Sequence, residues 1–300
     1  MKRSGMIVMM LAAAVTLAAD EAPKASVATE AQAAAFRAEM AKLGATEDAV
    51  VRGADGWLFL PSELRHLGVG EFWGERAKEV SRATTPEWAD PLPAIVDFNK
   101  QLEALGIKLI VVPVPPKAVA CPYRAMALGG PRIEPDRVAT ERFDVVHRRF
   151  YEILGADGVG VIDPTDALLS PVQSYCRTDT HWNGGGIEAT TQMVNRAIRK
   201  CDWYADLPKE RFASEQRQVT INGDLRRLAD DESIEKETLA LNFVGRKVDG
   251  ELKPLDNNED SPILLLGDSH LLVFHAGGDM HARGAGFADQ LALQTGIVPE

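Results

Sequence analysis

The segment Ser261-Pro-Ile-Leu-Leu-Leu-Gly-Asp-Ser-His270 decides the fold that we expect for this chain. Its centre, residues 263–266, is an uninterrupted apolar run between Pro262 and Gly267, which is typical of a strand buried on both faces of a parallel sheet. The turn at Gly-Asp-Ser places Ser269 at the carboxyl end of that strand. Ligands and reacting groups collect at this edge of open α/β sheets. We therefore expect an α/β domain with its chemistry at Ser269.

Two helix–glycine–strand units earlier in the chain predict a parallel sheet flanked by helices. Apolar residues recur at helical spacing over 92–105, a glycine follows, and residues 107–112 form a buried-strand candidate. The same order returns with a helix over 142–154 and a short strand over 159–163. Together with the strand near 261–266, these units are typical of a doubly wound sheet.

Other segments have clear local signals. Asp55-Gly56 is a hairpin turn signal ahead of an apolar strand, and Asn183 is a natural N-cap for a helix over 184–200. Residues 203–260 are polar and predict a β-rich insertion with surface loops. Further helices are expected over 30–43 and 287–295, and Ile297-Val298 resembles the opening of another strand. Because the chain stops at Glu300, we expect a final strand and helix to be missing.

Charge and composition exclude a nucleic-acid binder. The chain has 44 acidic and 33 basic residues, a net charge of −11, which repels polyphosphate. Aromatic residues make up only 6% of the chain, so a platform for stacking bases is not indicated. Its 300 residues, 45% of them apolar, can bury a substantial core.

The N-terminus predicts export. Lys2 and Arg3 precede an apolar run that ends in small residues near Ala19, the layout of a secretory signal peptide. An uncleaved membrane anchor is the alternative, although the run is short for a span. We expect a signal peptide over 1–19, a leader and first helix over 20–44, a catalytic domain over 45–300, and a periplasmic location.

The three cysteines do not form a recognisable framework. An exported protein could pair two of Cys121, Cys176 and Cys201 and leave one thiol free, and the sequence does not choose the pair. Their spacings match no zinc pattern.

Two short motifs carry the candidate chemistry. Asp179-Thr-His-Trp182 supplies a histidine with a carboxylate two residues before it, and Gly267-Asp-Ser269 supplies a hydroxyl. Acyl transfer needs a nucleophile, a base that takes its proton, and a group that fixes the tautomer of the base. Ser269, His181 and Asp179 suit these roles in that order.

These two motifs resemble the serine block and the Asp/His block of SGNH-type esterases, in reversed order. That permuted order, with Asp55-Gly-Trp-Leu-Phe-Leu60 and Pro113-Val-Pro-Pro-Lys117, resembles the alginate O-acetyltransferase family of the AlgJ/AlgX type over roughly residues 50–295. The resemblance implies an SGNH-hydrolase-like α/β fold and a periplasmic enzyme that moves acetyl groups onto an exopolysaccharide without a cofactor. It also implies a membrane-bound O-acyltransferase partner as the acetyl source. Family members continue well beyond the serine block.

Other polar residues have weaker functional interpretations. Lys117, Trp182 and His270 are candidate substrate contacts. His270 and His275 are alternative bases, but neither has a carboxylate so well placed to orient it. The residues His270, His275, Asp279 and His281 are a candidate metal-binding cluster. However, Gly277-Gly278 in the middle of this segment predicts a flexible loop that would not hold the ligands in a defined geometry, so we expect no metal.

The sequence is compatible with three functional classes. A polysaccharide O-acetyltransferase is favoured, a carbohydrate acetylesterase would use the same triad with water as acceptor, and a non-catalytic glycan-binding or assembly protein could retain the fold. The negative net charge fits poorly with polyanionic alginate unless a basic groove exists, so a neutral or differently charged glycan is also compatible.

Overall fold

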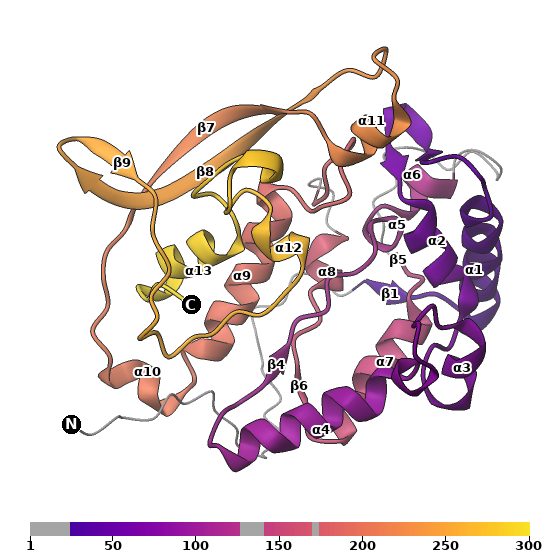
Figure 1. Cartoon of the computed structure of the whole chain (residues 1–300), viewed down its shortest axis with the longest axis horizontal. Helices are drawn as coiled ribbons and strands as arrows, with labels where there is room; N and C mark the ends of the chain where they lie inside the picture. Colours follow the sequence, from indigo (N-terminus) through magenta and orange to yellow (C-terminus); the bar gives the residue numbers. More distant parts are fainter. Residues whose placement is uncertain (1–24, 127–140, 170–173) are drawn as a thin grey trace.

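A pair of parallel strands, β4 (Ile110–Val111) and β6 (Gly160–Val161), lies at the centre of the computed structural model, which describes residues 25–126, 141–169 and 174–300 (Figure 1). Helix α4 (Pro91–Ala104) precedes β4, and helix α7 (Val145–Ala156) precedes β6. Both predicted helix–glycine–strand units are therefore confirmed. The glycine after α4, Gly106, has φ = +71°, the conformation in which a residue without Cβ ends a helix at low cost.

The predicted strand at 263–266 is not a strand buried on both faces. Ile263 is buried, whereas Leu264 and Leu266 are 50% and 85% exposed, so only alternate side chains face the core. Its backbone pairs on one side alone: Glu300 N donates to Ile263 O at 2.9 Å and Leu265 N donates to Glu300 O at 2.7 Å. A cleft separates its other side from β4, and none of the described strands forms a ladder with it there. The apolar run therefore lacks the second neighbour that would bury its outer face.

The N-terminal part packs two helices against a hairpin. Helix α1 (Glu30–Gly44) begins at a capping box made by Thr29 and Gln32 and packs against α2 (Pro61–Val69). Strands β2 (Val51–Arg52) and β3 (Leu58–Phe59) form the predicted hairpin. Asp55 and Gly56 in its turn both have positive φ, 51° and 74°, as a tight hairpin turn requires.

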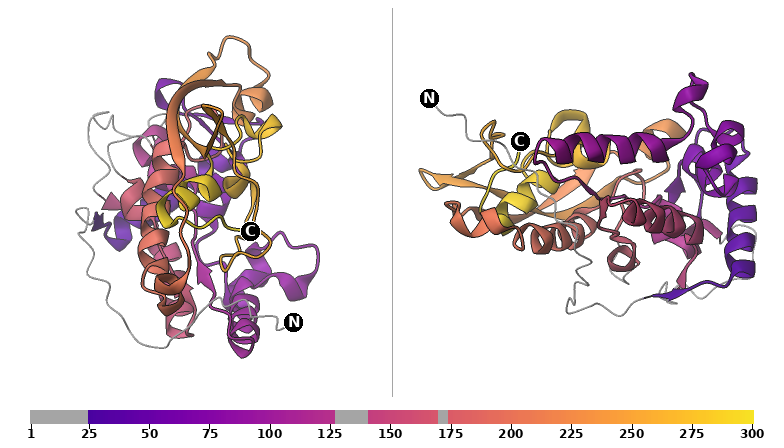
Figure 2. Two further views of the ribbon diagram at one scale, coloured as in Figure 1. Left: turned by 90° about the vertical axis from the view of Figure 1, so that its left-hand side faces the viewer. Right: turned by 90° about the horizontal axis from the view of Figure 1, so that it is seen from below.

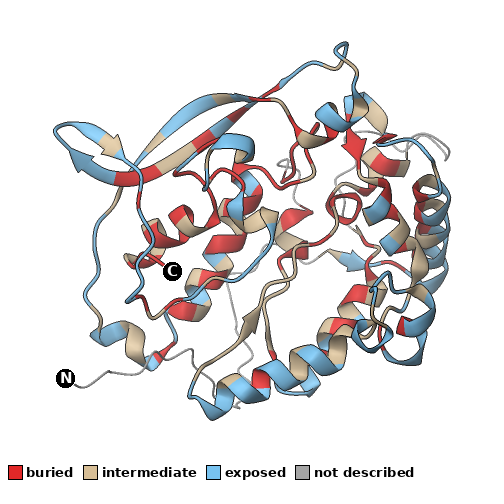
Figure 3. Cartoon of the chain, in the orientation of Figure 1, coloured by how far each residue is buried: buried red, intermediate tan, exposed pale blue. Residues whose placement is uncertain are grey.

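Helix α9 (Gly184–Ile198) lies in the core beside α13 (Phe287–Thr295), and both helices confirm the sequence expectations (Figure 3). Asn183 Oδ1 accepts a hydrogen bond of 3.1 Å from Gly186 N, which confirms it as the N-cap. A Cβ atom at Gly186 would collide with the carbonyl of Ser174, so this close approach requires glycine. The first turn of α9 is thus held against the loop that carries the Asp/His motif.

The insertion forms an antiparallel ribbon of β7 (Ala213–Ile221), β8 (Glu237–Val248) and β9 (Glu251–Lys253), which confirms its β-rich character. Figure 2 shows the ribbon arching past α9 and α13. Leu239 and Leu241 of β8 are buried in the core that includes α9. The ribbon therefore covers one side of the helical layer.

Shorter elements complete the described chain. The helices are α3 (Ala77–Val80), α5 (Lys117–Ala120), α6 (Pro122–Met126), α8 (Thr165–Leu168), α10 (Asp202–Asp206), α11 (Asp224–Ala229) and α12 (Ser269–Leu272), and β1 (Ser26–Val27) pairs in parallel with β5 (Glu141–Arg142). Turns of 3-10 helix lie at Ala54–Gly56, Gly74–Arg76, Pro86–Trp88 and Gly278–Met280. All three cysteines are free thiols, so the disulfide that an exported chain could form is not present.

The predicted signal peptide lies outside the described residues. Within the part that the structure describes, none of the helices has the length and apolar character needed to span a bilayer.

Candidate active site

Asp179 and His181 form a buried hydrogen-bonded pair on the loop before α9. His181 Nδ1 lies 2.6 Å from Asp179 Oδ1, and the backbone N–H of His181 donates to the same oxygen at 3.1 Å. The Asp179 side chain is fully buried and that of His181 is 8% exposed. This contact fixes the Nδ1–H tautomer, which leaves the lone pair of a neutral His181 on Nε2. The pair is thus arranged as in an acyl-transfer site, with His181 as the base and Asp179 as the carboxylate that orients it.

Two further donors hold the other oxygen of Asp179. Asp224 N and His281 Nε2 each lie 2.8 Å from Asp179 Oδ2. Burial acts to raise the pKa of Asp179, but hydrogen bonds from the two imidazoles and from the Asp224 amide outweigh it and lower the pKa below the ordinary value. Asp179 is therefore an ionised carboxylate at neutral pH.

His181 is poised to take a proton. Burial acts to lower the pKa of His181, but its hydrogen bond to Asp179 and the negative charges of Asp179 and Asp224 raise it above the ordinary value. Within the described residues, His181 Nε2 is buried and has no hydrogen-bond partner. The atom that would receive a proton from a nucleophile is therefore unoccupied by other contacts.

Lys117, expected to contact substrate, is instead a buried structural residue. Its Nζ donates to the carbonyls of Leu58 at 2.7 Å, Arg177 at 3.0 Å and Asp179 at 2.9 Å. An ammonium group has three donors, and all three are satisfied by these carbonyls. The side chain has no exposed surface, so it cannot reach a ligand in this conformation. Lys117 joins the hairpin strand β3 to the loop of the Asp/His motif.

Ser269 is the first residue of α12, and its turn contacts the Asp/His loop through His270. The ring of the next residue, His270, has its centroid 4.8 Å from that of His181. Trp182 Nε1 donates to the carbonyl of His270 at 2.9 Å, so the Asp/His loop anchors the serine turn. Within the described chain, the Ser269 hydroxyl makes no hydrogen bond, and none joins it to His181. The two motifs thus meet, while the nucleophile–base bond remains unformed.

A cleft of about 460 Å³ opens at the serine turn, between β4 and the 263–266 segment. Apolar residues form most of its wall, and both Trp182 and His270, the other predicted substrate contacts, line it. The polar residues among its lining are Glu63, Asp268 and His270. Burial raises the pKa of Glu63 to about 7, against the lowering effect of the charges of Lys117 and His181. The cleft can therefore present a neutral carboxyl group to a ligand.

Asp179, His181 and Asp224 also have ligand atoms within 4.8 Å of one another, a spacing that suits a metal ion. However, both oxygens of Asp179 already accept N–H donors, and His181 Nδ1 is engaged with Asp179. A cation would have to displace these bonds, so the arrangement fits a hydrogen-bonded Asp–His pair better.

Sequence reasoning missed three residues around this pair. Glu63 lies in the first turn of α2, where an acidic residue is an ordinary helix feature. Asp224 contributes its backbone N–H to Asp179 and its side-chain charge to His181. The sequence indicates His281 only as a metal-ligand candidate. Its position in a histidine-rich segment was a signal, but nothing in the sequence connects it to Asp179.

Comparison with known proteins places most of the chain in one family. Residues 50–291 match the family described as SGNH hydrolase-like domain, acetyltransferase AlgX. Two curated relatives, each a probable alginate O-acetylase AlgJ, come from Pseudomonas aeruginosa and Pseudomonas syringae pv. tomato. They are 27% identical over 184 and 185 residues, 59% of this chain. The aligned region spans only 40% of each relative's length.

Solved structures share the fold. The O-acetyltransferase domain of Pseudomonas putida AlgJ superposes with a TM-score of 0.57 at 18% identity, covering 84% of this chain and 77% of that one. Pseudomonas aeruginosa AlgX superposes with a TM-score of 0.54 at 14% identity, covering 88% of this chain and 57% of that one. The α/β fold is thus SGNH-hydrolase-like.

Proposed function

Because this chain belongs to the SGNH hydrolase-like, AlgX-type acetyltransferase family, we propose that it transfers acetyl groups onto hydroxyls of an exopolysaccharide through an acetyl-Ser269 intermediate. The observation that carries this proposal is the buried Asp179–His181 pair, with His181 Nε2 unpartnered among described residues and the His181 ring next to that of His270 in the serine turn. The names of the AlgJ relatives support the polysaccharide as the acceptor class.

The proposed reaction has two half-steps of the same chemistry. Ser269 Oγ attacks the carbonyl carbon of an acetyl donor while its proton passes to His181 Nε2, and the leaving group departs with that proton. A sugar hydroxyl then attacks the acetyl-serine ester and gives its proton to His181 Nε2, which returns it to Ser269. Asp179 stays ionised throughout and stabilises the imidazolium form of His181. The hydroxyl must move into hydrogen-bond reach of Nε2, and such bonds commonly tighten only when substrate binds.

Export and a membrane partner belong to the same proposal. A mature chain that begins after residue 19 would act in the periplasm, where no cytoplasmic acetyl donor is present. A membrane-bound O-acyltransferase would therefore supply the acetyl group, as the family resemblance implies.

The test uses the mature chain, a serine-directed fluorophosphonate probe and an acetyl ester donor. Wild type should be labelled at Ser269 and should move acetyl groups to an oligosaccharide, while Ser269→Ala and His181→Ala should do neither. The acceptor panel pairs a polyuronate with a neutral oligosaccharide, and mass spectrometry separates acetylated sugar from free acetate. Acetate release without sugar acetylation would identify an esterase instead. Labelling that persists in Ser269→Ala would overturn the acetyl-serine proposal.

A further inference from the structure

We propose that His281 is a positioning residue, which holds the Asp179 carboxylate in the orientation that His181 needs. Its catalytic consequence rests on the proposed function, whereas the contact itself can be tested without any activity. His281 lies 102 residues after Asp179, and its Nε2 lies 2.8 Å from Asp179 Oδ2. Asp179 thus stands between two imidazoles, since its Oδ1 is the oxygen that His181 Nδ1 contacts at 2.6 Å.

Burial makes this contact difficult to replace. The side chains of His281 and Asp179 are 8% and 0% exposed, so bulk water does not reach the carboxylate. A buried charge that loses a hydrogen-bond partner is destabilised, because nothing then compensates for the hydration that it lost on burial. Without His281, the Asp224 amide would be the only remaining described donor to Oδ2. The carboxylate would then be held more loosely on the side opposite His181.

The backbone around His281 is shaped to deliver the imidazole. His281 has φ = +70° and ψ = −48°, an uncommon region for a residue with a side chain. Its turn is closed by hydrogen bonds from Gly277 N to Ala282 O at 2.8 Å and from Phe274 N to Met280 O at 2.9 Å. Unfavourable backbone conformations of this kind persist where the surroundings impose them, often at functional sites.

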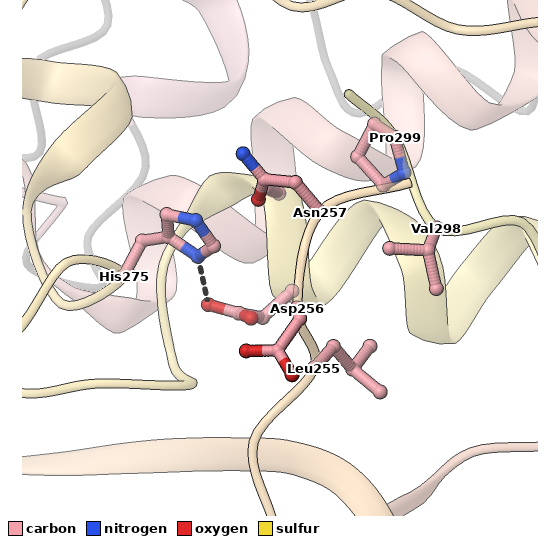
Figure 4. Close-up of a pocket in the computed structure, with 8 residues that line it drawn as sticks. Leu255, Asp256, Asn257, His275, Val298 and Pro299 are labelled. Atoms are coloured by element: carbon pink, nitrogen blue, oxygen red, sulfur yellow. Dashed lines mark hydrogen bonds and ion pairs between the residues drawn. The ribbon is translucent and has the colours of Figure 1, made fainter. Parts of the chain in front are cut away.

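Other roles for His281 fit the contacts less well. Its Nε2 is committed to Asp179, so this nitrogen cannot also accept a proton from Ser269. The neighbouring His275 is engaged elsewhere, with Nδ1 at 2.9 Å from Asp289 Oδ2, in a separate small pocket where it lies near Asp256 and Asn257 (Figure 4). The two histidines of this segment therefore serve different carboxylates.

That difference supplies a matched control. His281→Leu removes the donor, His281→Gln retains an N–H that can reach Asp179, and His275→Leu removes a similar His–Asp contact that does not touch Asp179. Two readouts are compared in all variants: the maximal rate of fluorophosphonate labelling, and the nuclear magnetic resonance signal of the His181 Nδ1 proton. Thermal unfolding of each variant verifies that it is folded at the assay temperature.

We expect His281→Leu to lower the maximal labelling rate on the order of 10- to 100-fold, with little change in the probe concentration that gives half-maximal rate. Its His181 Nδ1 proton signal should be lost to solvent exchange. His281→Gln should restore the rate to within about 3-fold and restore the signal, and His275→Leu should change neither. A wild-type proton signal in His281→Leu overturns the proposal, as does equal damage from His275→Leu or from His281→Gln. Absence of labelling in wild type would contradict the proposed function, and the proton signal would still decide the role of His281.

Discussion

Lys117 Nζ lies 2.9 Å from the backbone carbonyl oxygen of Asp179, a contact between a fully buried cation and the loop of the Asp–His pair. The same ammonium binds the carbonyls of Leu58 and Arg177. It also lies 5.1 Å from the ring centroid of Trp57, on the hairpin. The hairpin motif, the lysine motif and the Asp/His motif are therefore parts of one buried arrangement rather than three separate sites.

Lys117→Met should destabilise the protein strongly. The substitution removes the buried donor shared by three carbonyl oxygens, although Arg177 O keeps its hydrogen bond from Leu58 N at 3.0 Å. We expect a loss of roughly 3 kcal/mol or more in the free energy of unfolding, measured by urea titration. Lys209→Met is the matched control, because Lys209 Nζ also donates to three carbonyls but is exposed. That control should cost less than about 1 kcal/mol. Equal losses in both variants would contradict the structural role of Lys117.

Trp182→Phe should weaken the attachment of the serine turn to the Asp/His loop while the protein stays folded. The ring stacks on Phe287 with centroids 5.7 Å apart, and a phenyl ring preserves that contact. The hydrogen bond to the His270 carbonyl is lost, so we expect a destabilisation of about 1 kcal/mol and slower labelling of Ser269. Trp88→Phe, at a side chain 74% exposed, is the control and should leave both quantities unchanged. Unchanged labelling in Trp182→Phe would show that this bond does not position the serine.

Glu63→Gln should change how stability depends on pH. The pKa of Glu63 rises from 4.5 to about 7 on folding, so the folded chain keeps this proton when the unfolded chain has released it. The contribution of Glu63 therefore favours folding at low pH and is lost as the pH rises from about 4.5 to about 7. Relative to wild type, Glu63→Gln should gain on the order of 2 kcal/mol in the free energy of unfolding between pH 4 and pH 8.

The control for this titration is Glu235→Gln, at an exposed position. Its difference from wild type should stay within about 0.5 kcal/mol over the same pH range. A Glu63→Gln difference that is equally flat would show that Glu63 is ionised in the folded chain at neutral pH.

The sequence predicted those features that depend on short-range patterns. Apolar spacing located α4 and α7, and Asp55-Gly56 located the hairpin, because each signal lies within a few residues of the structure that it forms. The Asp179–His181 contact was predictable for the same reason, since the two residues are two positions apart.

The features that the sequence could not predict depend on contacts between residues that are far apart in the chain. An apolar run at 263–266 indicates a strand but not its neighbours, and among the described residues it forms backbone–backbone hydrogen bonds with Glu300 on one side. The sequence makes Lys117 a candidate substrate contact because a lysine is rarely buried, and its burial depends on three carbonyls that lie about 60 residues away in the chain. His281 reaches Asp179 only through a turn with positive φ.

The pH dependence of Ser269 labelling should report the proton affinity of His181. The pKa of His181 is raised because the hydrogen bond and charge of Asp179 outweigh the effect of burial, and only neutral His181 can take the proton of Ser269. The labelling rate should therefore increase with pH through a midpoint above 6.5, the ordinary value for histidine. Asp179→Asn removes the charge and favours the wrong tautomer, so the midpoint should fall and the maximal rate should drop on the order of 10³-fold or more. The measurement is the rate of labelling by the fluorophosphonate probe between pH 5 and pH 9. A wild-type midpoint below 6.5, or an Asp179→Asn profile that coincides with that of wild type, would mean that Asp179 does not raise the pKa of His181.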